Sequence, residues 1–284
     1  MHKNDRLDGK VCMVTGATGG IGKVTAETLA RRGAHVVVVG RNPAKCEAVV
    51  SGIRESGGQA DALIADLSSQ AQIRILAEAF GQKYPRLDVL VNNAGNFFMR
   101  RQLSEDGIEM TFALNHLSYF LLTNLLLDLL KASAPARIVN VASGAHRGNA
   151  LNFNRLLGEG LYMGWVAYGR SKFANILFTY ELARRLEGTG ITANALHPGL
   201  VNTQIGSQNN GYLGKLFQSL VFGRGISPEE GARTSVFLAS SPEVENVSGA
   251  YFYREKAVSS DPHTHNLADA ARLWRISAQM TGLA

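Results

Sequence analysis

The chain has 284 residues, of which 45% are hydrophobic and 18% are charged, a composition that excludes a disordered or fibrous protein. The net charge of +6 comes from basic residues scattered along the chain rather than from a basic run with interleaved aromatic residues, which argues against a nucleic-acid-binding protein. The start of the chain is polar, and no apolar run reaches the ~20 residues that span a bilayer. We therefore expect a soluble, cytoplasmic protein with no signal peptide and no membrane anchor.

Short apolar runs alternate with longer segments of helical spacing. Strands are predicted at 10–14, 35–39, 61–64, 89–91, 137–141 and 191–196, and helices at 20–32, 43–55, 69–80, 110–130, 166–186 and 228–239. Continuous apolar strands separated by helices indicate a parallel sheet that is buried on both faces. We expect an α/β fold with a doubly wound parallel sheet, in a single domain that covers residues 1–284.

Three further segments fall outside this alternation. Stretches 144–164 and 202–227 have no regular pattern, and loops of that length inside a compact domain are usually functional. Segment 202–227 carries apolar residues at helical spacing, among them Leu213, Leu216 and Leu220. It is predicted to form either a substrate lid or a face packed on the body or on another subunit. The C-terminal extension, 261–284, contains a helical pattern over 266–280 that we expect to seal the core.

A glycine-rich turn joins the first strand to the first helix, and it reads Thr15-Gly16-Ala17-Thr18-Gly19-Gly20-Ile21-Gly22. Its glycines let the backbone turn tightly and approach a pyrophosphate without a Cβ in the way. The helix then points its free N–H groups and positive dipole end at the phosphates. At this place the turn predicts a dinucleotide-binding Rossmann fold, with a plain tight turn as the alternative. The cofactor-binding residues predicted here are Gly16, Thr18, Gly20, Ile21 and Gly22.

The end of the second strand indicates which dinucleotide is bound. NAD-binding folds usually end this strand with an acidic residue that holds the ribose 2′-hydroxyl. Here the strand ends with Gly40, which offers no carboxylate, and Arg41, whose planar guanidinium can grip a 2′-phosphate. We expect NADP(H) to be preferred, with NAD(H) as the alternative. The structural alternative is that Arg41 only caps the next helix.

An ordered set of motifs makes the chain resemble the short-chain dehydrogenase/reductase family over essentially its whole length. The motifs are Thr15-Gly16-x-x-x-Gly20-x-Gly22, Asn92-Asn93-Ala94-Gly95, Asn115, Ser143, Tyr168-x-x-x-Lys172 and Pro198-Gly199-x-Val201-x-Thr203. Finer features resemble the retinol-dehydrogenase branch: Asn115-His116-Leu117, Ala145-His146, His197 before Pro198-Gly199, Ser248-Gly249-x-Tyr251-Phe252 and Leu273-Trp274-x-x-Ser277. Members of that branch that act on retinoids commonly carry a membrane anchor, and no anchor is expected in this chain. The resemblance therefore implies the chemistry of the branch but not a retinoid substrate.

Tyr168 and Lys172 are four residues apart on a predicted helix, so they lie on one face, one turn apart. A free tyrosine has a pKa of about 10, too high for an effective acid/base near neutral pH. A lysine ammonium ~5 Å away at an effective dielectric of ~20 contributes about 3 kcal/mol. We expect it to lower the pKa of Tyr168 by roughly two units. The resemblance adds that Lys172 holds the nicotinamide ribose.

Ser143 and Asn115 complete the predicted catalytic set. Ser143 follows a strand at the carboxyl edge of the sheet, where its hydroxyl can hold the substrate oxygen beside Tyr168. Asn115 lies inside a leucine-rich helix, where a buried amide is costly without partners. The resemblance implies that Asn115 helps to hold a proton-relaying water. The alternatives are a turn-capping serine and a satisfied core amide.

The remaining cofactor contacts follow from the resemblance. Asn93, Ala94 and Gly95 are expected to line the cofactor cleft, and Asp66 with Leu67 is expected to meet the adenine. The nicotinamide carboxamide is expected to contact Pro198, Gly199, Val201 and Thr203. No metal site is predicted, because His263 and His265 lie in a polar segment that favours solvent exposure.

Together these patterns predict an NADP(H)-dependent oxidoreductase that interconverts an alcohol and a lipophilic aldehyde or ketone, with Tyr168 as acid/base. The partner is a small apolar carbonyl or alcohol substrate, not a nucleic acid, and a homo-oligomer is left open. Two other classes of function are considered. A cofactor-binding sensor without chemistry is disfavoured by the retained Ser143, Tyr168 and Lys172, and a nucleic-acid-binding or scaffold protein rests on the basic charge alone.

Overall fold

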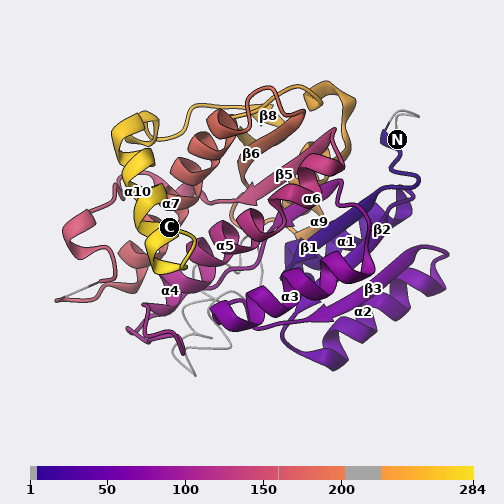
Figure 1. Cartoon of the computed structure of the whole chain (residues 1–284), viewed down its shortest axis with the longest axis horizontal. Coiled ribbons are helices and arrows are strands. Elements are labelled where there is room, and N and C mark those ends of the chain that lie inside the picture. Colours follow the sequence, from indigo (N-terminus) through magenta and orange to yellow (C-terminus); the bar gives the residue numbers. More distant parts are fainter. Residues whose placement is uncertain (1–4, 159, 202–224) are drawn as a thin grey trace.

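The computed structural model describes residues 5–158, 160–201 and 225–284, which form one eight-stranded sheet with helices on both faces (Figure 1). The strand order is β3-β2-β1-β4-β5-β6-β7-β8, with all neighbours parallel except the antiparallel pair β7 and β8. The strands are β1 (Val11–Thr15), β2 (His35–Gly40), β3 (Gln59–Ile64), β4 (Val89–Asn92), β5 (Ala136–Val141), β6 (Ile191–His197), β7 (Tyr251–Tyr253) and β8 (Lys256–Ala257). The predicted doubly wound, single-domain Rossmann fold is confirmed.

The helices divide between the two faces of the sheet. Alternate side chains of β1, β2 and β4 enter two separate cores, one shared with α1, α2 and α9 and the other with α3, α5 and α7. The long helices are α1 (Gly20–Arg31), α2 (Pro43–Glu55), α3 (Gln70–Lys83), α5 (Ser118–Leu125), α7 (Gly164–Arg185), α9 (Pro228–Ser240) and α10 (Leu267–Met280). The shorter segments are α4 (Met110–Phe112), η2 (Ala113–Leu117), α6 (Leu127–Ala132), η3 (Gly144–His146), η4 (Phe153–Arg155), η5 (Pro242–Val244) and η6 (Pro262–His265). In the described part of the chain, no helix is both long and apolar enough to traverse a bilayer.

The helix predicted over 110–130 is present, but it is not one regular α-helix. The chain forms α4, then the π-helical turn η2 at Ala113–Leu117, then α5 and α6. A π turn inserts an extra residue into a helix and is frequent at functional sites. Leucine-rich periodicity does not reveal it, because every segment remains helical and largely buried.

Strands β7 and β8 were not predicted. They have three and two residues, too few to show a periodic pattern. The predicted C-terminal helix is confirmed as α10, which buries Ala270 and Leu273 in a core that includes residues of α7. Strands β7 and β8 extend the sheet beyond β6, and α10 packs against α7.

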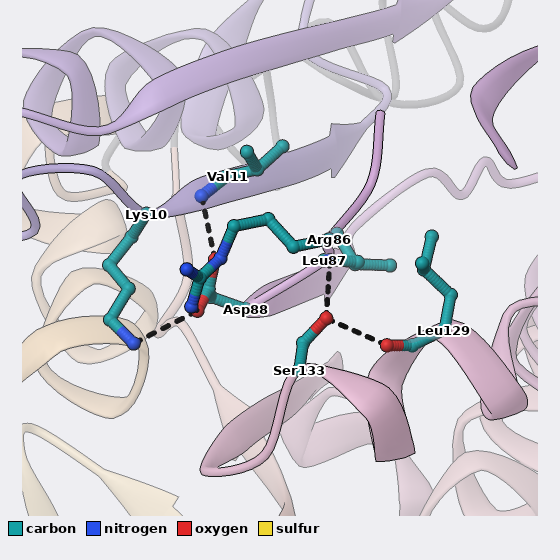
Figure 2. A network of polar contacts seen from close by, with 7 residues as sticks. All are labelled: Lys10, Val11, Arg86, Leu87, Asp88, Leu129 and Ser133. Atoms are coloured by element: carbon teal, nitrogen blue, oxygen red, sulfur yellow. Dashed lines mark hydrogen bonds and ion pairs between the residues drawn. The ribbon is translucent and has the colours of Figure 1, made fainter. Parts of the chain in front are cut away.

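Asp88, the residue before β4, connects the strands at the amino edge of the sheet, meaning the side at which the parallel strands begin. Figure 2 shows Lys10, Arg86 and the backbone of Val11 converging on its carboxylate. Lys10 Nζ and Val11 N each lie 2.9 Å away, and Arg86 donates two bonds at 2.8 and 2.5 Å. Burial alone would raise the pKa of Asp88, but these donors lower it below its ordinary value. The charge stays ionised and joins β1 to β4.

Candidate active site

Parallel strands bring their carboxyl ends to one edge of the sheet, where doubly wound folds bind ligands. Here that edge collects the glycine-rich turn after β1, the Asn93–Gly95 segment after β4, Ser143 after β5 and Pro198 after β6. Helix α7 starts beside them and supplies Tyr168 and Lys172. The structure thus gathers most of the predicted site in one place.

Three positions of the glycine-rich turn, 16, 20 and 22, have a backbone conformation or a close contact that favours glycine. Gly16 and Gly20 have φ values of +64° and +53°, in the left-handed region that favours glycine. A Cβ at Gly16 would lie 2.8 Å from the Cα of Ala94, and a Cβ at Gly22 would lie 2.4 Å from Asn93 Nδ2. The turn is therefore pressed against the end of β4.

Helix α1 begins without a side-chain cap. Its N-cap residue is Gly19, and its first turn contains no acidic residue. The helices α2, α3, α9 and α10 differ, since their first N–H groups are bound by the side chains of Asn42, Ser69, Ser227 and Asn266. Uncapped N–H groups at a positive dipole end suit a pyrophosphate, so the residues present fit the predicted dinucleotide.

At the end of β2, Gly40 leaves no room for a side chain. A Cβ there would lie 2.6 Å from Thr18 Cγ2 and 2.9 Å from Cys46 Sγ. Arg41 is exposed, and α2 is capped by Asn42, whose side chain accepts a backbone N–H at 3.0 Å. Arg41 therefore does not cap the helix, but it is solvent-exposed, as the alternative of a solvated residue also expects.

The segment after β4 is tied to the glycine-rich turn by Thr15. Its hydroxyl accepts the N–H groups of Asn93 and Ala94 at 2.9 and 3.1 Å, and Asn93 Nδ2 donates to Thr15 O at 2.8 Å. A Cβ at Gly95 would lie 3.2 Å from Lys172 Nζ. Asn93 thus has a structural task, and Gly95 lets the backbone approach the lysine.

Asp66 and Leu67 follow β3 at the same edge. One oxygen of Asp66 accepts both the N–H and the hydroxyl of Ser68, at 2.9 and 2.7 Å. Leu67 is buried in the core. The carboxylate therefore shapes the turn into α3, and the predicted contact of these residues with adenine stays a prediction.

Asn115 lies in the π turn with its side chain almost fully engaged. Its Oδ1 accepts Asn96 N at 2.8 Å, while its Nδ2 donates to Asn96 O at 2.9 Å and to Ser171 Oγ at 3.0 Å. Its main-chain carbonyl accepts Asn175 Nδ2 at 2.8 Å. The satisfied-amide alternative thus describes its side chain, which fixes the loop after β4 against α7. The water-holding role stays a prediction.

Lys172 is buried, with 3% of its surface exposed. Its Nζ donates to Val141 O at 3.0 Å and lies 5.5 and 5.8 Å from the ring centres of Tyr119 and Tyr168. No ion pair joins it to a carboxylate among the described residues. Burial lowers the pKa of Lys172 to about 7, because the site offers little to replace the hydration of the ammonium.

Tyr168 is half-buried, and burial raises its pKa above the ordinary value, while a side-chain hydrogen bond with Ser143 acts in the opposite direction. The expectation that Lys172 lowers the pKa of Tyr168 is therefore wrong for the protein alone. Burial has the largest effect on the pKa of both groups. Because it also favours the neutral amine of Lys172, it reduces the positive charge on which that expectation relied. The phenol is protonated at neutral pH, so it is set up to donate a proton.

Ser143 follows β5 in an extended conformation, with φ of −162° and ψ of 155°. It is half-buried, and its Oγ accepts Ala145 N at 3.2 Å. The turn-capping alternative is thus part of its role, and its side chain is also near enough to Tyr168 to lower the pKa of that phenol.

The segment after β6 closes over the glycine-rich turn. Gly199 has φ of +97°, and a Cβ there would lie 2.7 Å from Ile226 Cδ1. Val201 is buried against Ile21 and forms a parallel bridge with Ile226. Pro198 stands half-buried at the start of this segment. Thr203 and nearly all of the predicted lid, 202–227, lie outside the described residues.

An aromatic wall stands beside Tyr168. The ring centres of Phe97 and Trp165 lie 6.1 and 6.0 Å from that of Tyr168, and 6.2 Å from each other. Trp165 and Met163 are 45% and 59% exposed, which is unusual for such large apolar side chains. Trp165 therefore leaves apolar surface exposed beside the ring of Tyr168.

Two residues near Lys172 were missed from the sequence. Tyr119 lies under the ammonium, and Asn175 holds the main chain of Asn115. Asn175 follows Lys172 by three residues on α7, in a stretch whose side chains are otherwise largely apolar. A buried amide in such a stretch was the signal that could have identified it.

Other polar features lie apart from this edge. A surface cavity of about 780 Å³ borders the C-terminal half of α7 and the Thr264–Ala270 region, and it includes none of the predicted site residues. His263 and His265 are exposed, and the described residues contain no cluster of three His, Cys, Asp or Glu side chains suited to a metal.

Comparison with known proteins agrees with this geometry. The family model described as short chain dehydrogenase matches residues 10–212. The chain is 44% identical to human retinol dehydrogenase 14, with 98% of this chain and 88% of the relative covered. It is 43% identical to mouse retinol dehydrogenase 12, with 99% and 89% covered.

Solved structures show the same fold. An uncharacterized protein from Mycobacterium paratuberculosis superposes with a TM-score of 0.79 at 32% identity, covering 98% of this chain and 95% of that chain. The RhlG/NADP active-site complex of Pseudomonas aeruginosa has a TM-score of 0.71 at 32% identity, with 89% and 97% covered. The chain belongs to the short-chain dehydrogenase family, and it is an NAD(P)-dependent oxidoreductase that acts on CH–OH and C=O groups.

Proposed function

We propose that the protein is an NADP(H)-dependent oxidoreductase that interconverts lipophilic aldehydes or ketones with their alcohols. The observation that carries this proposal is the half-buried phenol of Tyr168, close enough to Ser143 for that side chain to lower its pKa, and one helical turn from the buried Lys172. These three groups stand at the carboxyl edge, beside a turn that fits a pyrophosphate.

Each side chain has a separate task. The bound nicotinamide supplies or accepts the hydride. Tyr168 Oη donates a proton to the carbonyl oxygen during reduction and takes it back during oxidation. Ser143 Oγ holds the same oxygen, so that the carbonyl carbon is aligned. Lys172 lies one helical turn from Tyr168 and would hold the nicotinamide ribose, and its amine has a pKa near neutrality.

The preference for NADP(H) is supported at the end of β2. A carboxylate at position 40 would collide with Thr18 and Cys46, and the exposed Arg41 next to it can bind a phosphate. The similar Pseudomonas aeruginosa protein is described with NADP in its active site. The preference for lipophilic substrates is supported by the wall of Phe97 and Trp165 and by relatives named for retinol, a lipophilic alcohol.

The proposal is tested by following NADPH and NADH oxidation with a panel of lipophilic aldehydes and ketones. We expect turnover with NADPH, and we expect Tyr168→Phe to lower kcat by about 10³-fold while NADPH binding persists. Tyr84→Phe is the matched control, because Tyr84 bonds to Asp61 far from the site and its loss leaves kcat unchanged. Tight NADPH binding with no turnover would instead favour a sensor.

A further inference from the structure

The peptide group between Ser143 and Gly144 is held at both ends by imidazole rings. His146 Nδ1 lies 2.6 Å from the carbonyl oxygen of Ser143, and Gly144 N donates to His197 Nδ1 at 3.1 Å. The two histidines come from different elements, η3 and β6. Rotation of this peptide would move Ala145, whose N–H donates to Ser143 Oγ at 3.2 Å and so orients the hydroxyl.

The hydrogen-bond partners define which nitrogen of each ring carries the proton. A carbonyl oxygen can only accept, so His146 Nδ1 is protonated, and its Nε2 accepts Asp261 N at 3.0 Å. His197 Nδ1 accepts two N–H groups, from Gly144 and from Gly199 at 3.1 and 3.2 Å, so its proton is on Nε2. The rings are neutral and in opposite tautomers.

The surroundings keep both rings neutral. Burial lowers the pKa of His197 to about 4, with smaller effects from His146 and Arg147, and burial also lowers the pKa of His146. The ring of Tyr253 stacks on His197 at 4.8 Å, and the edge of Tyr251 meets His146 at 5.1 Å. The charged neighbours are Arg147 and Asp261. Protonation of either ring would place an N–H against an N–H donor that the ring now accepts.

The contacts of His146 and His197 with the Ser143–Gly144 peptide form a clamp, and this clamp also connects distant segments to Ser143. Asp261 holds His146 through its backbone and accepts Gly148 N at 3.0 Å through its carboxylate. Arg147 donates to Ser259 O at 2.5 Å. The chain after β8 thus braces the loop after Ser143, while His197 joins that loop to Gly199.

We infer that His146 and His197 are positioning residues that hold the Ser143–Gly144 peptide so that the Ser143 hydroxyl faces Tyr168. The inference rests on the proposed function, since Ser143 acts on substrate only if the protein reduces carbonyl compounds. Neither ring is placed against the reacting atoms. Both act through the serine.

The inference is tested in the full chain by combining variants. His146→Phe and His197→Phe are each expected to lower kcat by about 10- to 100-fold, as small misplacements of reacting groups do. His146→Asn keeps a donor near the Ser143 carbonyl and His197→Asn keeps an acceptor for Gly144, so both restore most of kcat. His263→Phe is the control at an exposed histidine and leaves kcat unchanged.

The decisive comparison adds Ser143→Ala. If the histidines act through the serine, each phenylalanine variant combined with Ser143→Ala is no slower than Ser143→Ala alone. Multiplied losses, or wild-type kcat in both phenylalanine variants, would overturn the inference.

A second measurement separates the inference from the proposed function. Nitrogen-15 NMR of the histidine rings at pH 7 is expected to show His146 protonated at Nδ1 and His197 at Nε2, whether or not a substrate is found. The reverse tautomers or a charged ring would overturn the clamp. Absent turnover with the expected tautomers would reject the proposed function and, with it, the positioning role.

Discussion

The amino and carboxyl edges of the sheet each contain a buried ionisable side chain, but these two side chains have different numbers and kinds of hydrogen-bond partners. At the amino edge, Asp88 is surrounded by Lys10, Arg86 and a backbone N–H, and it remains ionised (Figure 2). At the carboxyl edge, Lys172 is as deeply buried but has a single carbonyl partner, and its pKa lies near 7. A matched charge holds strands together, whereas an unmatched charge is costly and is kept where chemistry needs it.

The largest expected effect is a loss of activity without a loss of stability. Lys172→Met is expected to lower kcat by about 10³-fold, equivalent to about 4 kcal/mol, without lowering the free energy of unfolding, because an apolar chain of similar length replaces a desolvated amine. Steady-state kinetics and urea unfolding measure the two quantities. Lys10→Met is the counterpart at the amino edge and leaves kcat unchanged. Normal turnover with lost stability in Lys172→Met would remove the distinction between the edges.

The reverse pattern is expected at Asp88. Asp88→Asn is expected to lower the free energy of unfolding by about 3 kcal/mol with kcat unchanged, because three donors lose their charged acceptor. The folded-state pKa is lowered, so this contribution is complete above the unfolded value near 4 and is lost as pH falls through the folded value. The two proteins therefore converge in acid. The exposed Asp128→Asn is the control and stays within about 0.5 kcal/mol.

The lysine predicts a slope with pH. Its pKa falls from 10.5 to about 7 on folding, so the unfolded chain binds more protons between these values and stability rises with pH across that window. Between pH 7 and 9 the free energy of unfolding relative to Lys172→Met should rise by up to about 1.4 kcal/mol per pH unit. Denaturant unfolding at several pH values measures it. A flat difference would mean that the lysine keeps its charge.

A smaller effect is expected for the cofactor at the carboxyl edge. Arg41→Ala is expected to weaken NADPH binding by about 10- to 100-fold and to leave NADH binding unchanged, since only NADPH carries the 2′-phosphate. Fluorescence titration of both cofactors gives the two Kd values. Equal weakening of both would assign Arg41 to a part that the cofactors share.

The smallest effect concerns the neighbouring residue. Asn42→Ala removes the cap of α2 and is expected to cost about 1 kcal/mol of stability. Thermal or urea unfolding measures this loss. The ratio of the Kd values for NADPH and NADH should stay that of the parent, and a changed ratio would move the phosphate contact from Arg41 to the cap.

The elements with strong local signals were predictable. Helix α2 was predicted with both ends correct, because Pro43 marks its first residue and the apolar spacing continues to its end. The four valines of β2 predicted a strand buried on both faces. The ordered motifs predicted which side chains gather at the carboxyl edge.

What failed depends on contacts between distant segments. The π turn accompanies the pairing of the Asn115 amide with the backbone of Asn96, which no spacing within the helix reveals. The pKa of Tyr168 was misjudged because a distance in sequence gives a Coulomb interaction but not the burial that outweighs it. From the sequence, His146 and His197 were noted only as residues that resemble the retinol-dehydrogenase branch. Their common contact with the Ser143–Gly144 peptide depends on the pairing of β5 with β6, which the sequence spacing does not reveal.

The π turn at Ala113–Leu117 has a consequence for how this family member can tolerate insertions and deletions. One residue corresponds to about 100° of rotation in a helix, so the extra residue sets the angle between the face that carries Asn115 and the face that carries Tyr119. Both faces meet at α7, one through Ser171 and the other under Lys172. Loss of a single residue here would restore a regular helix and turn one of the two faces away, although no side chain of the site had been changed.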